Sequence, residues 1–181
     1  YAPPAEQEGL RAEILMLNAA NKPMKAAPKK QIRKPAVSED PSGSAYFDPH
    51  LVPKSRVSYR SRGARISDFK IVTPTGMVVN HLIRRQEYIY TYTVDFTETA
   101  FSVRPAMLIK TLRGMDLGGA MASKIVDSIP VIEAGTRLHV QFKFRCLLSP
   151  GTYFLNAGVE GVVDGVKTYL HRLIDAAMFR V

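Results

Sequence analysis

The chain has 181 residues, and its 25 Lys and Arg against 16 Asp and Glu give a formal net charge of +9. Its single cysteine, Cys146, excludes an internal disulfide and a cysteine-rich metal cluster, and no apolar run approaches the roughly 18 residues that a membrane-spanning helix needs. The chain begins at Tyr1 rather than Met, so we expect a fragment of a longer protein, and its N-terminus lacks the pattern of a secretion signal.

Residues 1–45 are predicted to be a flexible linker that is basic and rich in proline. The stretch 22–35 carries six basic residues and no acidic one, with prolines that oppose both helix and sheet. A short helix is predicted over 10–17, where apolar residues recur at helical spacing. We interpret the basic stretch as a tether in preference to an attachment to nucleic acid or anionic lipid, because no aromatic residue is interleaved.

Residues 46–181 are predicted to form the compact domain, entered through an extended segment that packs on its surface. Apolar and polar residues alternate from Tyr88 to Phe96 and from Arg137 to Leu148, as in strands with one buried face. Further strands are predicted at Ala64–Val72, Ala106–Leu112, Ile125–Val131, Thr152–Val159 and Ala177–Val181. So many short strands are typical of an all-β fold, an antiparallel sandwich of jelly-roll or immunoglobulin-like type.

Two segments of this domain are interpreted as connections. Gly118-Gly119 is taken as a turn signal, like Ala134-Gly135 and Pro150-Gly151. The only helical candidate in the domain is Tyr169–Ala176.

No motif in the sequence predicts catalysis, a cofactor or a metal. The glycines before Lys167 lack the spacing of a phosphate-binding loop, and the four histidines lack a paired-ligand spacing. Cys146 lies on the apolar face of its strand, which indicates a core residue. An acid–base pair such as Asp95 or Glu160 across a groove ranks last among the alternatives, because no spacing forces two carboxylates together.

A row of polar residues on the outward face of the strand from Arg137 is the candidate binding site. These donors alternate along the strand about 6.6 to 6.8 Å apart, which suits an anionic or hydroxyl-rich ligand. They suit a solvated face or a guarded strand edge equally well. The row consists of Arg137, His139, Gln141, Lys143 and Arg145.

The tyrosine ladder Tyr88, Tyr90 and Tyr92 offers aromatic faces on which sugars or bases could stack. It shares its side of the strand with Val94 and Phe96, so packing in the core is the favoured interpretation.

Four segments carry a resemblance to a known family: Tyr46–Pro49, Ser58–Ile66, Ser149–Phe154 and His171–Val181. In this order they are similar to the C-terminal carbohydrate-binding domain of Wzt-type ATP-binding subunits from O-antigen polysaccharide ABC exporters, over residues 46–181. The sequence departs from the family after Gly119, where Ala120 and Met121 stand in place of a frequent Asn/Thr pair.

The resemblance implies a non-enzymatic jelly-roll-like sandwich, joined by a linker to a cytoplasmic ATPase domain that works with a membrane subunit at the inner membrane. It implies a homodimer, with or without strand exchange, that recognises the capped non-reducing terminus of the O-antigen polysaccharide and couples it to export. The polar row from Arg137 to Arg145 is expected to bind that terminus.

The alternative is a nucleic-acid-binding or capsid-like protein with a basic arm in front of a β-sandwich. Counting 11 basic minus 6 acidic residues leaves +5 of the net charge in residues 1–63, the part that consists mainly of the predicted tether. The charge therefore favours a local anionic or polar glycan site, and no nucleic-acid partner is expected.

Overall fold

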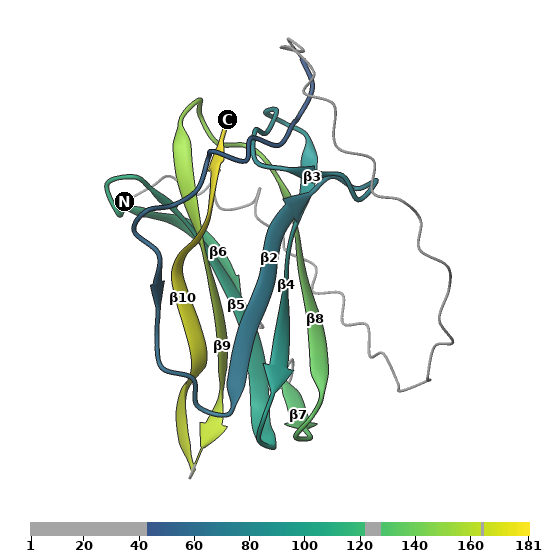
Figure 1. The fold of residues 1–181 in the computed structure, drawn as a ribbon, viewed down its shortest axis with the longest axis vertical. Coiled ribbons are helices and arrows are strands. Elements are labelled where there is room, and N and C mark those ends of the chain that lie inside the picture. The colour runs from purple at the N-terminus through teal and green to yellow at the C-terminus, as the bar shows by residue number, and fades with distance from the viewer. Residues whose placement is uncertain (1–42, 122–127, 164) are drawn as a thin grey trace.

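The computed structural model describes residues 43–121, 128–163 and 165–181; the predicted helix over 10–17 and nearly all of the predicted linker lie outside them. The described residues form ten strands and no helix. The strands make two antiparallel sheets packed face to face (Figure 1). The predicted all-β sandwich is therefore confirmed.

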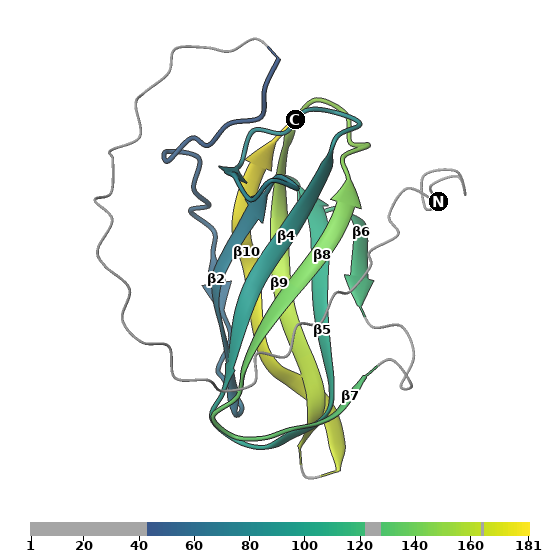
Figure 2. The same ribbon diagram turned by 90° about the vertical axis from the view of Figure 1, so that its right-hand side faces the viewer.

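The larger sheet has the strand order β1-β10-β9-β5-β6, and β7 pairs with β5 as well. The smaller sheet has the order β3-β2-β4-β8 and lies in front of the larger one in Figure 2. The strands of the larger sheet are β1 (Val57–Ser58), β5 (Ala100–Thr111), β6 (Asp116–Met121), β7 (Ile129–Ile132), β9 (Thr152–Val163) and β10 (Val166–Arg180). Those of the smaller sheet are β2 (Ala64–Val72), β3 (Val78–Val79), β4 (Glu87–Phe96) and β8 (Arg137–Arg145).

The core lies between the two sheets and is rich in aromatic side chains. Tyr88, Tyr90 and Tyr92 of β4 point into it, and each is at most 2% exposed. Cys146 is fully buried beside them. The tyrosine ladder and the cysteine are therefore core residues, as the alternating pattern predicts.

The segment Gly118-Gly119 lies within β6 and is not a turn. Both glycines pair with β5, Gly119 opposite Leu108. A Cβ atom at Gly119 would lie 2.5 Å from the carbonyl oxygen of Met107, so the backbone approaches too closely for a side chain. Glycine is used here for close packing of strands, which the sequence does not distinguish from turn formation.

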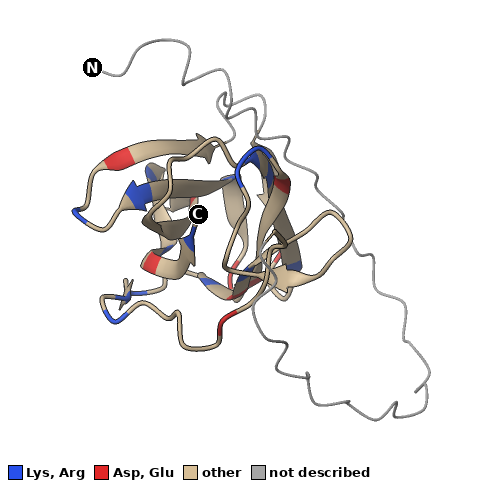
Figure 3. Ribbon diagram, turned by 90° about the horizontal axis from the view of Figure 1, so that it is seen from above, with Lys and Arg blue, Asp and Glu red and all other residues tan. Residues whose placement is uncertain are grey.

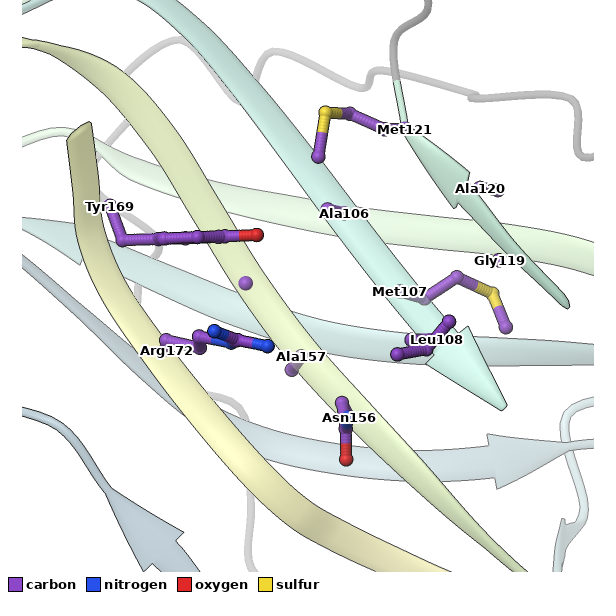
Figure 4. Close-up of a pocket in the computed structure, with 11 residues that line it drawn as sticks. Ala106, Met107, Leu108, Gly119, Ala120, Met121, Asn156, Ala157, Tyr169 and Arg172 are labelled. Carbon is purple, nitrogen blue, oxygen red and sulfur yellow. The ribbon is translucent and has the colours of Figure 1, made fainter. Parts of the chain in front are cut away.

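The segment Tyr169–Ala176, predicted as a helix, is part of the long strand β10. Its pairing with β9 shifts register between Tyr169 and His171 and again between Leu173 and Ala177. Such irregularities re-aim side chains, so that Tyr169 and Arg172 point to the same side although they are three residues apart (Figure 4). The predicted helix is therefore wrong. Residues three positions apart also share one face of a helix, so the sequence alone does not distinguish this irregular strand from a helix.

Residues 43–63, here called the strap, run along the sandwich and lead directly into β2. Tyr46 stacks on His81 with ring centroids 4.1 Å apart, and the backbone N–H of Asp48 donates to Asn80 Oδ1 at 2.7 Å. Further along, β1 pairs with β10. The predicted packing of this segment on the domain surface is confirmed.

His171 joins the strap to both sheets. Its Nδ1 accepts a hydrogen bond from the Ile66 N–H of β2 at 3.0 Å, and its Nε2 lies 3.2 Å from Ser58 Oγ of the strap. The ring is therefore neutral, with the proton on Nε2. Burial, aided by the nearby charge of Arg65, lowers the pKa of His171 below its ordinary 6.5.

We expect the free energy of unfolding to fall as the pH drops below about 6.5, because unfolded His171 takes up a proton there while the folded imidazole stays neutral. The contribution of His171 is complete above that pH and is lost as the pH falls toward the folded-state pKa. Melting temperatures between pH 8 and pH 5 should fall less steeply for His171→Gln than for the wild type, and equal slopes would contradict this role. His81, whose pKa is also lowered by burial, titrates in both proteins and cancels in the comparison.

Candidate functional site

The five predicted site residues lie along β8 on the outer face of the smaller sheet; we call them the β8 row. The structure brings them together as one line on an edge strand. Arg137 Nε lies 2.5 Å from Asp95 Oδ1, and Lys143 Nζ lies 2.9 Å from Glu87 Oε2, so two of its three formal cations face carboxylates of β4.

The other members of the β8 row also have neighbours. His139 Nδ1 lies 3.3 Å from Thr93 Oγ1, and Arg145 donates from Nε to the Arg85 carbonyl at 3.0 Å. Exposed ion pairs such as those of the row contribute about 0–1 kcal/mol to stability. A ligand could therefore replace the carboxylate partner of Arg137 or Lys143 at little energetic cost. The structure does not test the predicted assignment of the ligand site to the β8 row, so the row remains one of two candidates.

A second candidate is a hollow of about 280 Å³ on the outer face of the larger sheet, across β10, β9, β5 and β6. We call it the groove. Figure 4 shows Tyr169 and Arg172 extending from β10 on one side and Met121 of β6 on the other. Its lining includes Ala106, Leu108, Met121, Gly158, Tyr169 and Arg172.

Small residues make the floor of the groove, and the ring of Tyr169 lies against it. A Cβ atom at Gly158 would lie 3.2 Å from Cε1 of Tyr169 and 3.8 Å from the Cβ of Ala106. Tyr169 is 36% exposed, so its ring contacts the sheet and still faces solvent. An aromatic side chain in this setting offers an apolar platform with a polar hydroxyl at its rim.

The guanidinium of Arg172 lies beside this platform. Its Cζ is 5.0 Å from the ring centroid of Tyr169 and 5.9 Å from that of Tyr59 in the strap. These distances are typical of cation–π contacts, which orient a guanidinium without neutralising it. Within the described residues, Arg172 has no carboxylate at ion-pair distance.

Other cations on the same face are paired with carboxylates. Lys110 Nζ lies 2.6 Å from Asp175 Oδ1, and Lys167 Nζ lies 3.1 Å from Glu160 Oε2. Basic and acidic residues occur on both sheets, as Figure 3 shows, so a general excess of charge does not mark the groove. Arg172 differs from Lys110 and Lys167 in that no described carboxylate lies at ion-pair distance from it.

The floor of the groove is tied through the core to the smaller sheet. The Tyr92 hydroxyl accepts a hydrogen bond from the Ala106 N–H at 3.1 Å and lies 3.0 Å and 2.9 Å from the carbonyl oxygens of Ala106 and Gly158. Burial raises the pKa of Tyr92 well above 10, so the hydroxyl keeps its proton and donates it to one of these carbonyls. Tyr92 thereby fixes two residues that line the groove.

A family model described as the Wzt C-terminal domain matches residues 55–181. The chain belongs to this family. It is similar to the crystal structure of the C-terminal domain of Wzt, with a TM-score of 0.64 and 25% sequence identity over 72% of this chain and 80% of that one. A search of the curated proteins finds no match.

Another similar structure is the Pseudomonas fluorescens alkylpurine DNA glycosylase AlkC bound to DNA containing an abasic site analog. Its TM-score is 0.37 and its identity 14%, over 65% of this chain and 30% of that one, values too low to carry an argument about function.

Membership of the Wzt family confirms the resemblance found in the sequence. The Wzt C-terminal domain is non-catalytic, and the family implies O-antigen export and an ABC transporter as partner. In the part of the chain that the structure describes, no cluster of three His, Cys, Asp or Glu side chains could hold a metal ion. No helix in that part is long and apolar enough to cross a membrane.

Tyr169 and Arg172 are not among the predicted site residues, because the sequence of their segment favours a helix over a strand. The small residues at Ala106 and Gly158 were a usable signal, since small side chains inside a strand often mark close approach of another group. Ala120 and Met121 also line the groove.

Proposed function

We propose that this chain is a non-catalytic carbohydrate-binding module that recognises the capped non-reducing terminus of an O-antigen polysaccharide and couples it to export by an ABC transporter. The observation that carries the proposal is the groove of a Wzt C-terminal domain, in which an exposed tyrosine face lies beside an arginine that has no carboxylate partner among the described residues.

The groove suits the end of a polysaccharide better than its interior. A sugar ring would stack on Tyr169, and the guanidinium of Arg172 would donate hydrogen bonds to its substituents. The volume of about 280 Å³ is just below the roughly 300 Å³ at which ordinary ligand pockets begin. A hollow of this size suits a small part of the polysaccharide, and we propose that this part is the capped terminus.

The wider setting is part of the same proposal, and family membership supports it through the ABC transporter that the family implies. The module acts as a homodimer beside the ATPase domain and the membrane subunit of the same exporter, on the cytoplasmic side and peripheral to the inner membrane. Residues 1–45 would then be the tether between the ATPase domain and the sandwich.

A pair of variants tests where the polysaccharide binds. We expect Tyr169→Ala to weaken retention of capped O-polysaccharide about 2- to 10-fold, because the stacking platform is lost. The double variant Lys143→Ala, Arg145→Ala, on the other sheet, is expected to bind like the wild type. Retention is measured on immobilised protein against capped and uncapped polysaccharide.

Each alternative outcome of this experiment has a distinct meaning. Loss of binding in the Lys143→Ala, Arg145→Ala variant alone would place the site at the β8 row. Equal retention of capped and uncapped polysaccharide by the wild type would contradict recognition of the terminus.

A further inference from the structure

We propose that the groove selects a saccharide end group that carries a negative charge, a carboxylate or a phosphate, and that Arg172 is the residue that reads this charge. The proposal rests on the proposed function and goes beyond it, since recognition of a terminus does not by itself require a charged one.

The position of Arg172 is set by the fold on both sides. The Tyr59 N–H donates to the carbonyl oxygen of Arg172 at 3.0 Å, which fixes the backbone at this point of β10. The guanidinium is within cation–π distance of the rings of both Tyr59 and Tyr169. A guanidinium held against aromatic faces keeps its N–H groups at the edge available for a planar anion and loses little entropy on binding.

Among the described residues, no carboxylate on this face is paired with Arg172. Asp175 is paired with Lys110, and Glu160 with Lys167, so the carboxylates that lie nearby are already engaged. None of the residues that line the groove is an Asp or a Glu. Among the described lining residues, an anionic ligand would therefore meet the cation of Arg172 and no carboxylate.

A merely solvated arginine is the competing interpretation, and the surroundings of Arg172 argue against it. The side chain is half-buried, and it borders a hollow whose floor consists of small residues. On the β8 row, by contrast, Arg137 is 66% exposed at its side chain and is paired with Asp95. Arg137 is thus exposed and paired, whereas Arg172 is half-buried beside the groove and contacts aromatic rings.

Matched sugar probes test the proposal on the whole chain. Methyl glucuronide and methyl glucoside share a ring and differ by a carboxylate, and a phosphorylated methyl glucoside supplies the phosphate arm. Two-dimensional amide NMR titrations give both the affinity and the residues that shift. We expect at least one charged probe to bind about 10- to 100-fold more tightly than methyl glucoside, with shifts at Gly158 and Tyr169.

Two variants of Arg172 distinguish a loss of the preference for charged ligands from a loss of folding. Arg172→Gln is expected to abolish the preference for the charged probes while the spectrum keeps the dispersion of a folded protein, and Arg172→Lys is expected to keep a reduced preference. The proposal is overturned if charged and neutral probes bind the wild type equally, if the preference survives in Arg172→Gln, or if no probe shifts the amides of the groove.

The two experiments distinguish a failure of the anion proposal from a failure of the proposed function. If polysaccharide retention depends on Tyr169 but the probes show no charge preference, terminus recognition stands and the selection of an anion fails. If a charged probe binds through Arg172 while polysaccharide is not retained, the anion site stands and the proposed function fails.

Discussion

Replacing Lys110 by methionine is expected to lower the free energy of unfolding by about 3 kcal/mol. The side chains of Lys110 and Asp175 are only 16% and 7% exposed, and their charged atoms lie 2.6 Å apart. Methionine keeps most of the apolar stem of lysine but leaves the carboxylate of Asp175 buried with Ser55 as its remaining side-chain partner. Urea denaturation at neutral pH measures the change.

Lys143→Met is the matched control for this experiment. Lys143 also forms an ion pair, with Glu87, but the two side chains are 44% and 53% exposed. The expected loss is therefore under about 1 kcal/mol. The double variant Lys110→Met, Asp175→Asn should regain much of the lost stability, because asparagine removes the unpaired charge and tolerates the positive φ of 52° at this position. A Lys110→Met protein as stable as Lys143→Met would show that the buried pair contributes nothing.

The second large effect is expected for Tyr92→Phe, which should lower the free energy of unfolding by about 1–3 kcal/mol. The change removes only a hydroxyl, but that hydroxyl accepts from the Ala106 N–H and donates to a carbonyl of the groove floor. The variant leaves these backbone groups buried with fewer partners. Thermal unfolding measures the loss, and amide hydrogen exchange at Ala106 should become faster.

Tyr90→Phe provides an unusually close control. Tyr90 lies two residues away on the same face of β4 and is equally buried, but its hydroxyl has no hydrogen-bond partner in the described part of the chain. Removing an unsatisfied buried hydroxyl should leave stability unchanged or raise it slightly. If both variants lose the same stability, the hydrogen bonds of Tyr92 are not the cause.

The regular strands could be predicted because their signal is local. Alternation of apolar and polar residues from Tyr88 to Phe96 reports which side of one strand is buried, whatever that strand pairs with. The same pattern places Leu138 and Phe144 inside and Arg137 and Lys143 outside, as the structure shows.

The partners of the β8 row could not be predicted in the same way. Asp95 faces Arg137 and Glu87 lies near Lys143 only because β4 and β8 pair in one particular register. That register is a property of two strands separated by a long stretch of sequence, and neither strand alone contains it. The sequence thus indicates a row of cations and gives no sign that two of them have partners.

The groove was missed because it depends on departures from regular geometry. A shift in register at Tyr169 brings Arg172 to the same side of β10, and Gly158 of another strand makes room for the tyrosine ring. Read along the chain, these residues resemble a helix face and a flexible glycine. Only the assembled sheet shows that they border one hollow.

The strap has a mechanical consequence. Its contacts with the sandwich are arranged in series: Tyr46 and Asp48 are held at His81 and Asn80, and Tyr59 is held at Arg172. Tension applied through the residues before 43 would load the Tyr46 and Asp48 contacts first, and would reach the wall of the groove only after they had yielded. The strap would therefore act as a force buffer between residue 43 and Arg172.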